Sequence, residues 1–151
     1  MNEFYKIIEF LKSTIESNPL VHTITHGTPD LIDIDKKNIY PLVHLNVTQS
    51  QILDGYVAFD FEITSLDIRN VVKTNVRDKF LGNDNELDNL NTCHAILNHL
   101  ITKLKLQYND YDVELLNEPN LIPMLLQFSN QLDGWQTTLT LGIKNEVIVC
   151  D

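Results

Sequence analysis

An alternation of apolar and polar side chains over residues 56–68 constrains the fold of this chain more than any other feature. Four apolar residues occupy every second position there: Val57, Phe59, Phe61 and Ile63. Asp60 and Glu62 lie between them. A period of two is typical of a β-strand, whose successive side chains point to opposite faces of the sheet. We therefore expect a strand with one apolar face and one largely acidic face.

A second strand is predicted just before it, over residues 40–48, where alternate residues from Val43 to Val47 are apolar. Residues 49–55 are expected to form the turn between the two strands. Pro41 cannot donate a hydrogen bond to a sheet, so it belongs at the start of its strand or on an edge. A two-stranded hairpin alone is only marginally stable in water, so its apolar face requires a helix against it.

Two segments have the period of an amphipathic helix. The first begins near Phe4 and is expected to end before Pro19, because proline cannot continue a helix. The second follows Asp84 or Asn85, either of which can cap it. Its apolar stripe consists of Leu87, Leu90, Cys93, Leu97, Leu100, Ile101 and Leu104. The residues expected to form the core stripe are Leu90, Leu97, Leu100, Ile101 and Leu104, together with Trp135.

The remaining strands are predicted from short β-rich or alternating runs, with turns at residues 26–30, 117–120, 133–134 and 144–146. These runs cover residues 20–25, 31–34, 108–116, 121–128, 135–143 and 147–150, the last two forming a terminal hairpin. The order of elements predicts one α+β domain over residues 1–151. It should have a mainly antiparallel sheet, with an N-terminal helix and a long central helix packed on one face.

Residues 69–85 lack a clear period. They contain four of the eleven basic residues of the chain: Arg69, Lys73, Arg77 and Lys79. A long segment without regular structure inside a compact domain is usually functional or mobile. Two interpretations remain open, a surface loop and an extended arm that reaches an acidic face of a neighbouring subunit.

The charge balance disfavours a nucleic-acid-binding protein. Twenty-one acidic residues against eleven basic ones give a net charge of −10, and a nucleic-acid groove usually needs a basic excess. The acidity suits a solvated surface, or a surface that repels polyanions or meets a basic partner.

The first residues do not resemble a signal peptide, and no apolar run is long enough to span a bilayer. Cys93 and Cys150 are expected to stay reduced in a cytoplasm.

No motif for catalysis, metal binding or cofactor binding stands out. His94 and His99 are five residues apart on a predicted helix, unlike a helical metal pair, and the sequence contains no Cys-x-x-Cys. It has no glycine-rich phosphate loop and no nucleophile elbow. Asp60 and Glu62 share a strand face, as the paired carboxylates of a hydrolase do, but a solvated or partner-facing surface explains them as well. We expect no catalytic residue, no cofactor and no metal.

Three segments carry a resemblance to a known family. They are residues 33–44, the helical stretch 91–98, and Gly134-Trp135 with the end of the chain at 149–151. In these segments and in its order of elements, the chain resembles the tail-terminator and tail-completion (neck ring) proteins of tailed bacteriophages. It is most similar to those in phages of Bacteroidetes, including crAss-like phages.

The resemblance implies a structural virion protein, assembled in the host cytoplasm, that forms a ring of six or twelve copies in the tail or neck. Its partners would be tail-tube, portal or connector, and other ring proteins, with DNA passing through the lumen without specific binding and no membrane involved. In such a ring, the face with Asp60 and Glu62 is expected to line the channel or meet a partner. The basic residues of the arm would contact a neighbouring subunit: Arg69, Lys73, Arg77 and Lys79. Two alternatives are a small acidic adaptor or chaperone-like binding module, and an enzyme that uses Asp60 and Glu62.

Overall fold

A computed structural model describes residues 2–28, 40–69, 85–106, 112–127 and 131–147. It contains α1 (Glu3–Glu16), β1 (Thr23–His26), β2 (Leu42–Leu53), β3 (Tyr56–Ile68), α2 (Glu86–Lys105), β4 (Glu114–Leu115), β5 (Ile122–Gln127) and β6 (Leu132–Lys144). The strands form one sheet in the order β1-β2-β3-β6-β4, and β5 also pairs with β6. All pairs are antiparallel except β1 with β2. The predicted α+β class is confirmed.

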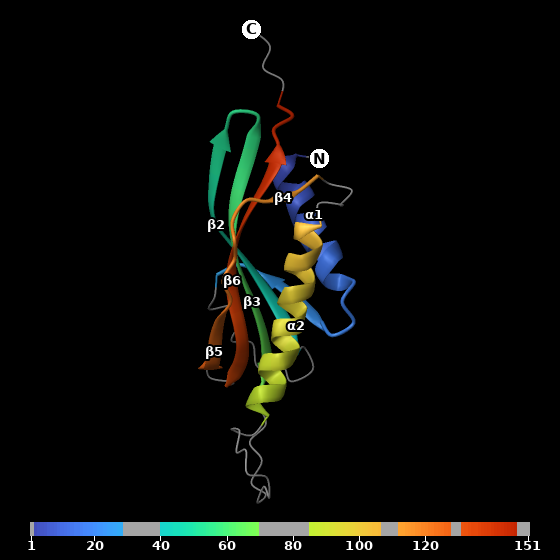
Figure 1. The fold of residues 1–151 in the computed structure, drawn as a ribbon, viewed down its shortest axis with the longest axis vertical. Helices are drawn as coiled ribbons and strands as arrows, with labels where there is room; N and C mark the ends of the chain where they lie inside the picture. Colours follow the sequence, from blue (N-terminus) through green and yellow to red (C-terminus); the bar gives the residue numbers. More distant parts are fainter. Residues whose placement is uncertain (1, 29–39, 70–84, 107–111, 128–130, 148–151) are drawn as a thin grey trace, which may run out of the picture.

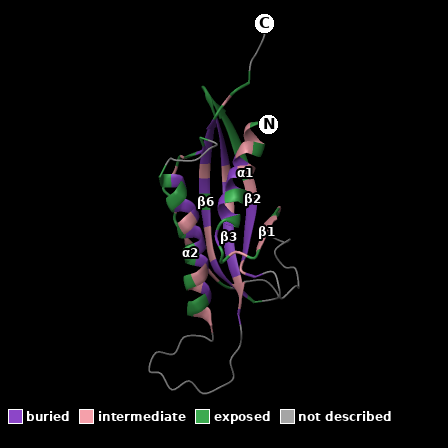
Figure 2. Ribbon diagram, turned by 90° about the vertical axis from the view of Figure 1, so that its right-hand side faces the viewer, coloured by how far each residue is buried: buried purple, intermediate pink, exposed green. Residues whose placement is uncertain are grey.

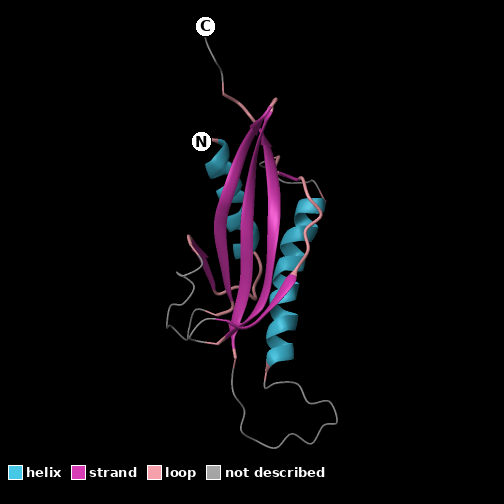
Figure 3. Cartoon of the chain, turned by 90° about the vertical axis from the view of Figure 1, so that its left-hand side faces the viewer, coloured by secondary structure: helices cyan, strands magenta, loops and turns pink. Residues whose placement is uncertain are grey.

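Both helices pack on the same face of the sheet, and Figure 3 looks onto the opposite face, with the helices behind the strands. The core lies between the helices and the apolar rows of β2, β3 and β6. Val57, Phe59, Phe61 and Ile63 all belong to this core, so the predicted alternation in β3 is confirmed. The two central pairs, β2 with β3 and β3 with β6, place three long strands side by side beneath the helices (Figure 1).

Helix α1 begins and ends as the sequence predicts. The Asn2 side chain accepts a hydrogen bond from the Tyr5 amide at 3.3 Å, which satisfies one of the free amides of the first turn. The helix ends at Glu16, three residues before Pro19. Its buried face consists of Ile7, Phe10, Leu11, Thr14 and Ile15. Phe4 and Ile8, which share the predicted apolar face, are only half-buried.

Helix α2 differs from its prediction in its first turn. Leu87, expected in the apolar stripe, is 48% exposed, and Leu90 is half-buried, as is Trp135. The turn instead buries Asn89, whose side chain donates to the Ile68 carbonyl at 3.0 Å. The predicted stripe holds from Cys93 onward, where the buried residues of the helix are Cys93, Ile96, Leu97, Leu100, Ile101 and Leu104. Asn85 occupies the cap position but makes no side-chain cap, and Asp84 lies outside the described residues.

The hairpin of β2 and β3 is longer than predicted. Residues 49–53 continue β2 instead of forming the turn, and only Asp54 and Gly55 connect the strands. Asp-Gly is a favoured two-residue hairpin turn, and Gly55 has the positive φ of 80° that such a turn requires. The register shifts between Val47 and Gln49. The end of the hairpin therefore extends beyond the helices (Figure 1) and is exposed (Figure 2).

The predicted turn at Asp133 and Gly134 is also wrong, because both residues lie inside β6 and are buried. A side chain at Gly134 would collide with the backbone of Ser65 on the neighbouring strand, so glycine allows a close strand approach here. Asp133 forms a buried ion pair with Arg69. The contacts with Ser65 of β3 and with Arg69, the residue after β3, override the local turn preference of Asp-Gly.

The shorter predicted strands are found in part. The strand predicted at 20–25 appears as β1, and Pro41 directly precedes β2, as expected. β5 contains Pro123 and shifts register between Met124 and Gln127, as expected of a bulged strand. Of the run at 108–116, only β4 is a strand among the described residues. Residues 145–147 form no strand, whereas 31–34 and 148–150 lie outside the described residues.

The sheet face opposite the helices carries a second, smaller core that the alternation did not predict. It consists of the buried residues Tyr40, Leu42, Leu66 and Leu132, with Ile68 and Met124 packed against them. It lies where β2 begins and β3 ends, since Leu42 pairs with Leu66. The polar part of this face therefore lies beyond the smaller core, toward the hairpin end.

Candidate functional site

The polar part of the open sheet face, here called the polar face, carries the carboxylates predicted to face a channel or partner. Its seven residues are Asn46 and Gln49 of β2, Asp60 and Glu62 of β3, and Gln136, Thr138 and Thr140 of β6. Glu62 lies between Asn46 and Thr138, and Asp60 lies beside Thr140. Adjacent strands thus bring together side chains that are up to 94 residues apart in the sequence (46 to 140).

The two carboxylates are fixed by side chains of β6. The Thr140 hydroxyl donates to Asp60 Oδ1 at 2.7 Å, and Gln136 Nε2 donates to Glu62 Oε1. Both acids are half-buried. Both donors are neutral, and no cation is paired with either carboxylate among the described residues, so no positive charge in the described fold offsets these acids. The arrangement presents a fixed negative surface.

Arg69 was expected to reach a neighbouring subunit, and this prediction is wrong because its side chain is engaged inside the chain. It donates two hydrogen bonds of 2.8 Å to Asp133 and lies 3.1 Å from Glu86. Arg69 is only 9% exposed, and Asp133 is fully buried. Such a paired guanidinium anchors the end of β3 to β6 and to the first turn of α2.

Asn85 and Asn89 complete this anchor by donating to the Ile68 carbonyl at 3.2 and 3.0 Å. The two ends of the predicted arm, at Arg69 and Asn85, are therefore fixed to the same place in the fold. The other basic residues assigned to the arm, Lys73, Arg77 and Lys79, lie outside the described residues, and their role stays a prediction.

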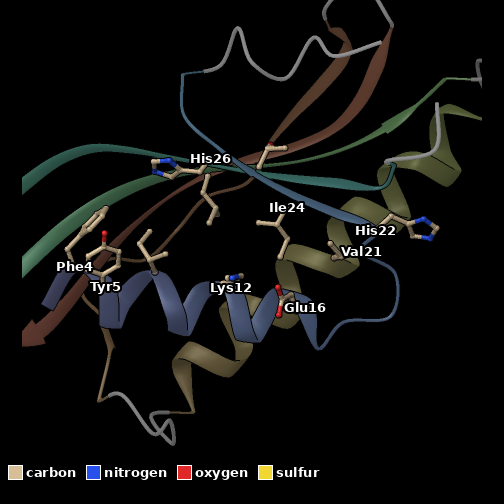
Figure 4. Close-up of a pocket in the computed structure, with 11 residues that line it drawn as sticks. Phe4, Tyr5, Lys12, Glu16, Val21, His22, Ile24 and His26 are labelled. Carbon is tan, nitrogen blue, oxygen red and sulfur yellow. The ribbon is translucent and has the colours of Figure 1, made fainter. Parts of the chain in front are cut away.

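A groove between α1 and β1 has a volume of about 530 Å³ and was not predicted (Figure 4). Its lining is mostly apolar: Phe4, Ile8, Val21, Ile24 and Leu45, with Tyr5 and Thr25. Lys12, Glu16 and two histidines, His22 and His26, also line it. Figure 4 shows Ile24 pointing from β1 toward the helix. A groove of this size and composition is typical of sites that hold a small ligand or a few side chains of a partner.

The end of the β2–β3 hairpin is a second exposed apolar surface, here called the tip and defined by Ile52, Leu53, Asp54 and Tyr56. Ile52 is 77% exposed, and Leu53 and Tyr56 are 43% and 47% exposed. Exposed apolar side chains that gather at one place often mark an interaction site. The tip and the groove share no residue, so the two surfaces can act independently.

Two reactive side chains, Cys93 and His44, are buried. Burial raises the pKa of the Cys93 thiol to about 12, so it stays protonated and is a poor nucleophile. His44 is 1% exposed, with Nδ1 2.6 Å from the Thr25 hydroxyl and Nε2 2.9 Å from the Gly27 carbonyl. Because a carbonyl only accepts hydrogen bonds, Nε2 carries the proton, and Nδ1 accepts from Thr25. Burial lowers the pKa of His44, so it is a neutral structural residue at neutral pH.

Among the residues that the structure describes, no three His, Cys, Asp or Glu side chains come together as a metal site. No helix in the described ranges has both the length and the apolarity to cross a membrane.

No model of a known protein family matches this sequence, and comparison with curated proteins also finds no match. The candidate surfaces are therefore interpreted from their own geometry and chemistry.

Proposed function

We propose that this protein is a structural component of a phage tail or neck, a tail-terminator-like ring protein without catalytic activity. In this role it joins the tail tube to the head-proximal connector, and DNA passes through its lumen. The observation that carries the proposal is the polar face, where Asp60 and Glu62 are held outward on a sheet face that neither described helix covers. A wall that repels phosphates lets DNA slide past without binding.

The arrangement of strands and helices gives the polar face a rigid support. Three long strands, paired over most of their length, support the polar face, and the helices pack behind it against the main core. The buried anchor of Arg69 and Asp133 fixes one end of this sheet. A rigid sheet with helices on its outer side is able to present the same charged surface from every subunit of a ring.

The experiment reverses the charge of the polar face. Assemblies of the Asp60→Lys/Glu62→Lys variant should retain duplex DNA in a salt-sensitive manner, whereas wild-type assemblies should not, as measured by co-sedimentation at several salt concentrations. Glu9→Lys/Asp88→Lys, which changes the net charge equally on the helices, is the matched control. Equal DNA retention by the two double variants would contradict a channel-facing position for Asp60 and Glu62.

A second candidate, a small acidic adaptor or chaperone-like binding module, is favoured by the groove between α1 and β1. Such a module would hold an apolar segment of a client protein in the groove and would not need to form a ring. A dimer that persists at every protein concentration, and that binds one client, would favour this candidate over the ring.

A further inference from the structure

The outer part of β2 has an edge without charged side chains. Residues 46–53 contain no charged residue, although charged residues make up 21% of the sequence. β1 covers only Leu42–Leu45, so among the described strands the rest of β2 has β3 as its one neighbour. Monomeric proteins usually protect a long exposed edge with charges or proline, because its free amides and carbonyls pair readily with another strand. In the described part of this edge, the one feature that protects against such pairing is the register shift after Val47.

β1 offers a second edge beside the groove. It pairs with β2 on one side, and within the described residues no strand lies on its other side. Thr23 and Gly27 donate their amides to Pro41 and Leu45, next to or within β2. Since amide directions alternate along a strand, the amides of Ile24 and His26 point to the outer edge. A strand added there would place alternate side chains over the groove.

We propose that residues 49–53 of one copy add as a strand to the outer edge of β1 in a second copy, with Ile52 in the groove between α1 and β1. This inference rests on the proposed ring function and names the contact between subunits. Backbone hydrogen bonds supply affinity in strand addition, and a pocket for alternate side chains supplies specificity. Ile52 is 77% exposed, and the apolar lining of the groove would cover it.

Charge supports the same pairing. Asp54 follows the added strand directly, and Lys12 lines the groove. Neither side chain forms an ion pair with any described residue, so each is free to meet the other across the contact. Glu16 lies one helical turn after Lys12 and would disfavour a shift of Asp54 toward the end of α1. Tyr5, His22 and His26 are the other titratable groups of the groove.

The contact joins two different surfaces, so after one contact has formed one copy keeps a free groove and the other keeps a free tip. Repetition of such a head-to-tail contact gives a closed ring, or a filament if the rotation does not close. A two-fold axis would instead place each tip in the other copy's groove and stop at a dimer, which is incompatible with the ring on which the inference rests. The inference therefore predicts an assembly that grows beyond a dimer.

Two variants of exposed residues test the contact. Ile52→Lys places a charge where the tip enters the groove, and His26→Pro removes the amide on the outer edge of β1. We expect each variant alone to remain monomeric by sedimentation velocity under conditions in which the wild type assembles. Ile122→Lys, a charge placed at an isoleucine that is 61% exposed on β5, and His26→Ala, which keeps the amide, should both assemble like the wild type.

Mixing the two variants gives the decisive result. The His26→Pro chain has an intact tip and the Ile52→Lys chain has an intact groove, so the mixture should form a one-to-one dimer that grows no further. Full-size assemblies of either variant alone, while the wild type also forms rings, would overturn this contact and leave the proposed function standing. A wild type that never associates would overturn both.

Discussion

Arg69 joins three parts of the molecule that are far apart in the sequence. Its guanidinium binds Asp133 of β6 with two hydrogen bonds and lies beside Glu86 of α2, while its amide donates to the Gln131 carbonyl at 3.0 Å. At the scale of single residues, this side chain determines how the end of β3 meets the rest of the fold. The sequence pattern placed it in a surface arm because other basic residues follow it in the chain.

Replacing Arg69 by methionine should lower the free energy of unfolding by about 3–5 kcal/mol, since it removes the cation that is paired with the buried Asp133 carboxylate. Urea unfolding measures this loss. Lys103→Met, at an exposed position of α2, should change stability by less than about 0.5 kcal/mol. Similar stabilities for the two variants would show that the Arg69 pair is not an anchor.

His44 should make stability depend on pH. Its pKa is lowered from 6.5 by burial, so the unfolded chain binds a proton as the pH falls through 6.5 and the folded chain binds it only at lower pH. Between those two values the unfolded state holds more protons, and the free energy of unfolding decreases as the pH falls. The stabilisation from neutral His44 is fully present above 6.5.

The measurement compares wild type with His44→Gln by urea unfolding at pH values from roughly 5 to 8. The advantage of the wild type should shrink as the pH falls. Burial raises the pKa of Asp67, which acts in the opposite direction, but Asp67 is present in both proteins and its effect cancels in the comparison. A difference that is constant over the whole range would contradict the assignment to His44.

At the scale of elements, α2 provides a matched pair of leucines. Leu97 is fully buried between the helix and the sheet, and Leu87 is 48% exposed in the first turn. Leu97→Ala should reduce the free energy of unfolding by about 2–5 kcal/mol, because it removes packed methyl groups and leaves a cavity. Leu87→Ala should change it by less than about 0.5 kcal/mol. Equal losses in chemical denaturation would contradict the face assigned to the helix.

The sequence predicted those elements whose signal is local. The period of two in β3 and the helical periods of α1 and α2 reflect which side chains face the core, so the structure confirms them. Asp133 and Gly134 were read as a turn because their preference is local, whereas Arg69 and Ser65, which keep them in a strand, lie 64 and 69 residues away (133 − 69 and 134 − 65). Contacts between residues so far apart in the sequence cannot be recognised from a short stretch of it.

The candidate surfaces were likewise predictable only where their signal is local. Asp60 and Glu62 were identified from the alternation of β3, but their partners Gln136 and Thr140 became visible only with the pairing of β3 and β6. The groove was missed because Phe4 and Ile8 have the spacing of core residues. They stay half-buried because the groove beside β1 exposes one side of them, and the parallel pairing that places β1 there was not predicted.

At the scale of the whole molecule, each candidate function predicts a different assembly. The polar face requires several copies around a channel, the tip and groove supply a head-to-tail contact, and a binding module requires neither. The net charge of −10 opposes close packing of copies, so a ring should form more readily as salt screens that repulsion. Assembly state therefore distinguishes the proposals better than any single substitution.

The most direct test of the ring is the native mass of the purified protein by light scattering over a range of protein concentrations, with negative-stain images of the heaviest species. We predict that the mass rises to a fixed limit of six or twelve copies and that the images show closed rings with a central channel. A dimer or a monomer at every concentration would contradict a ring-forming structural protein.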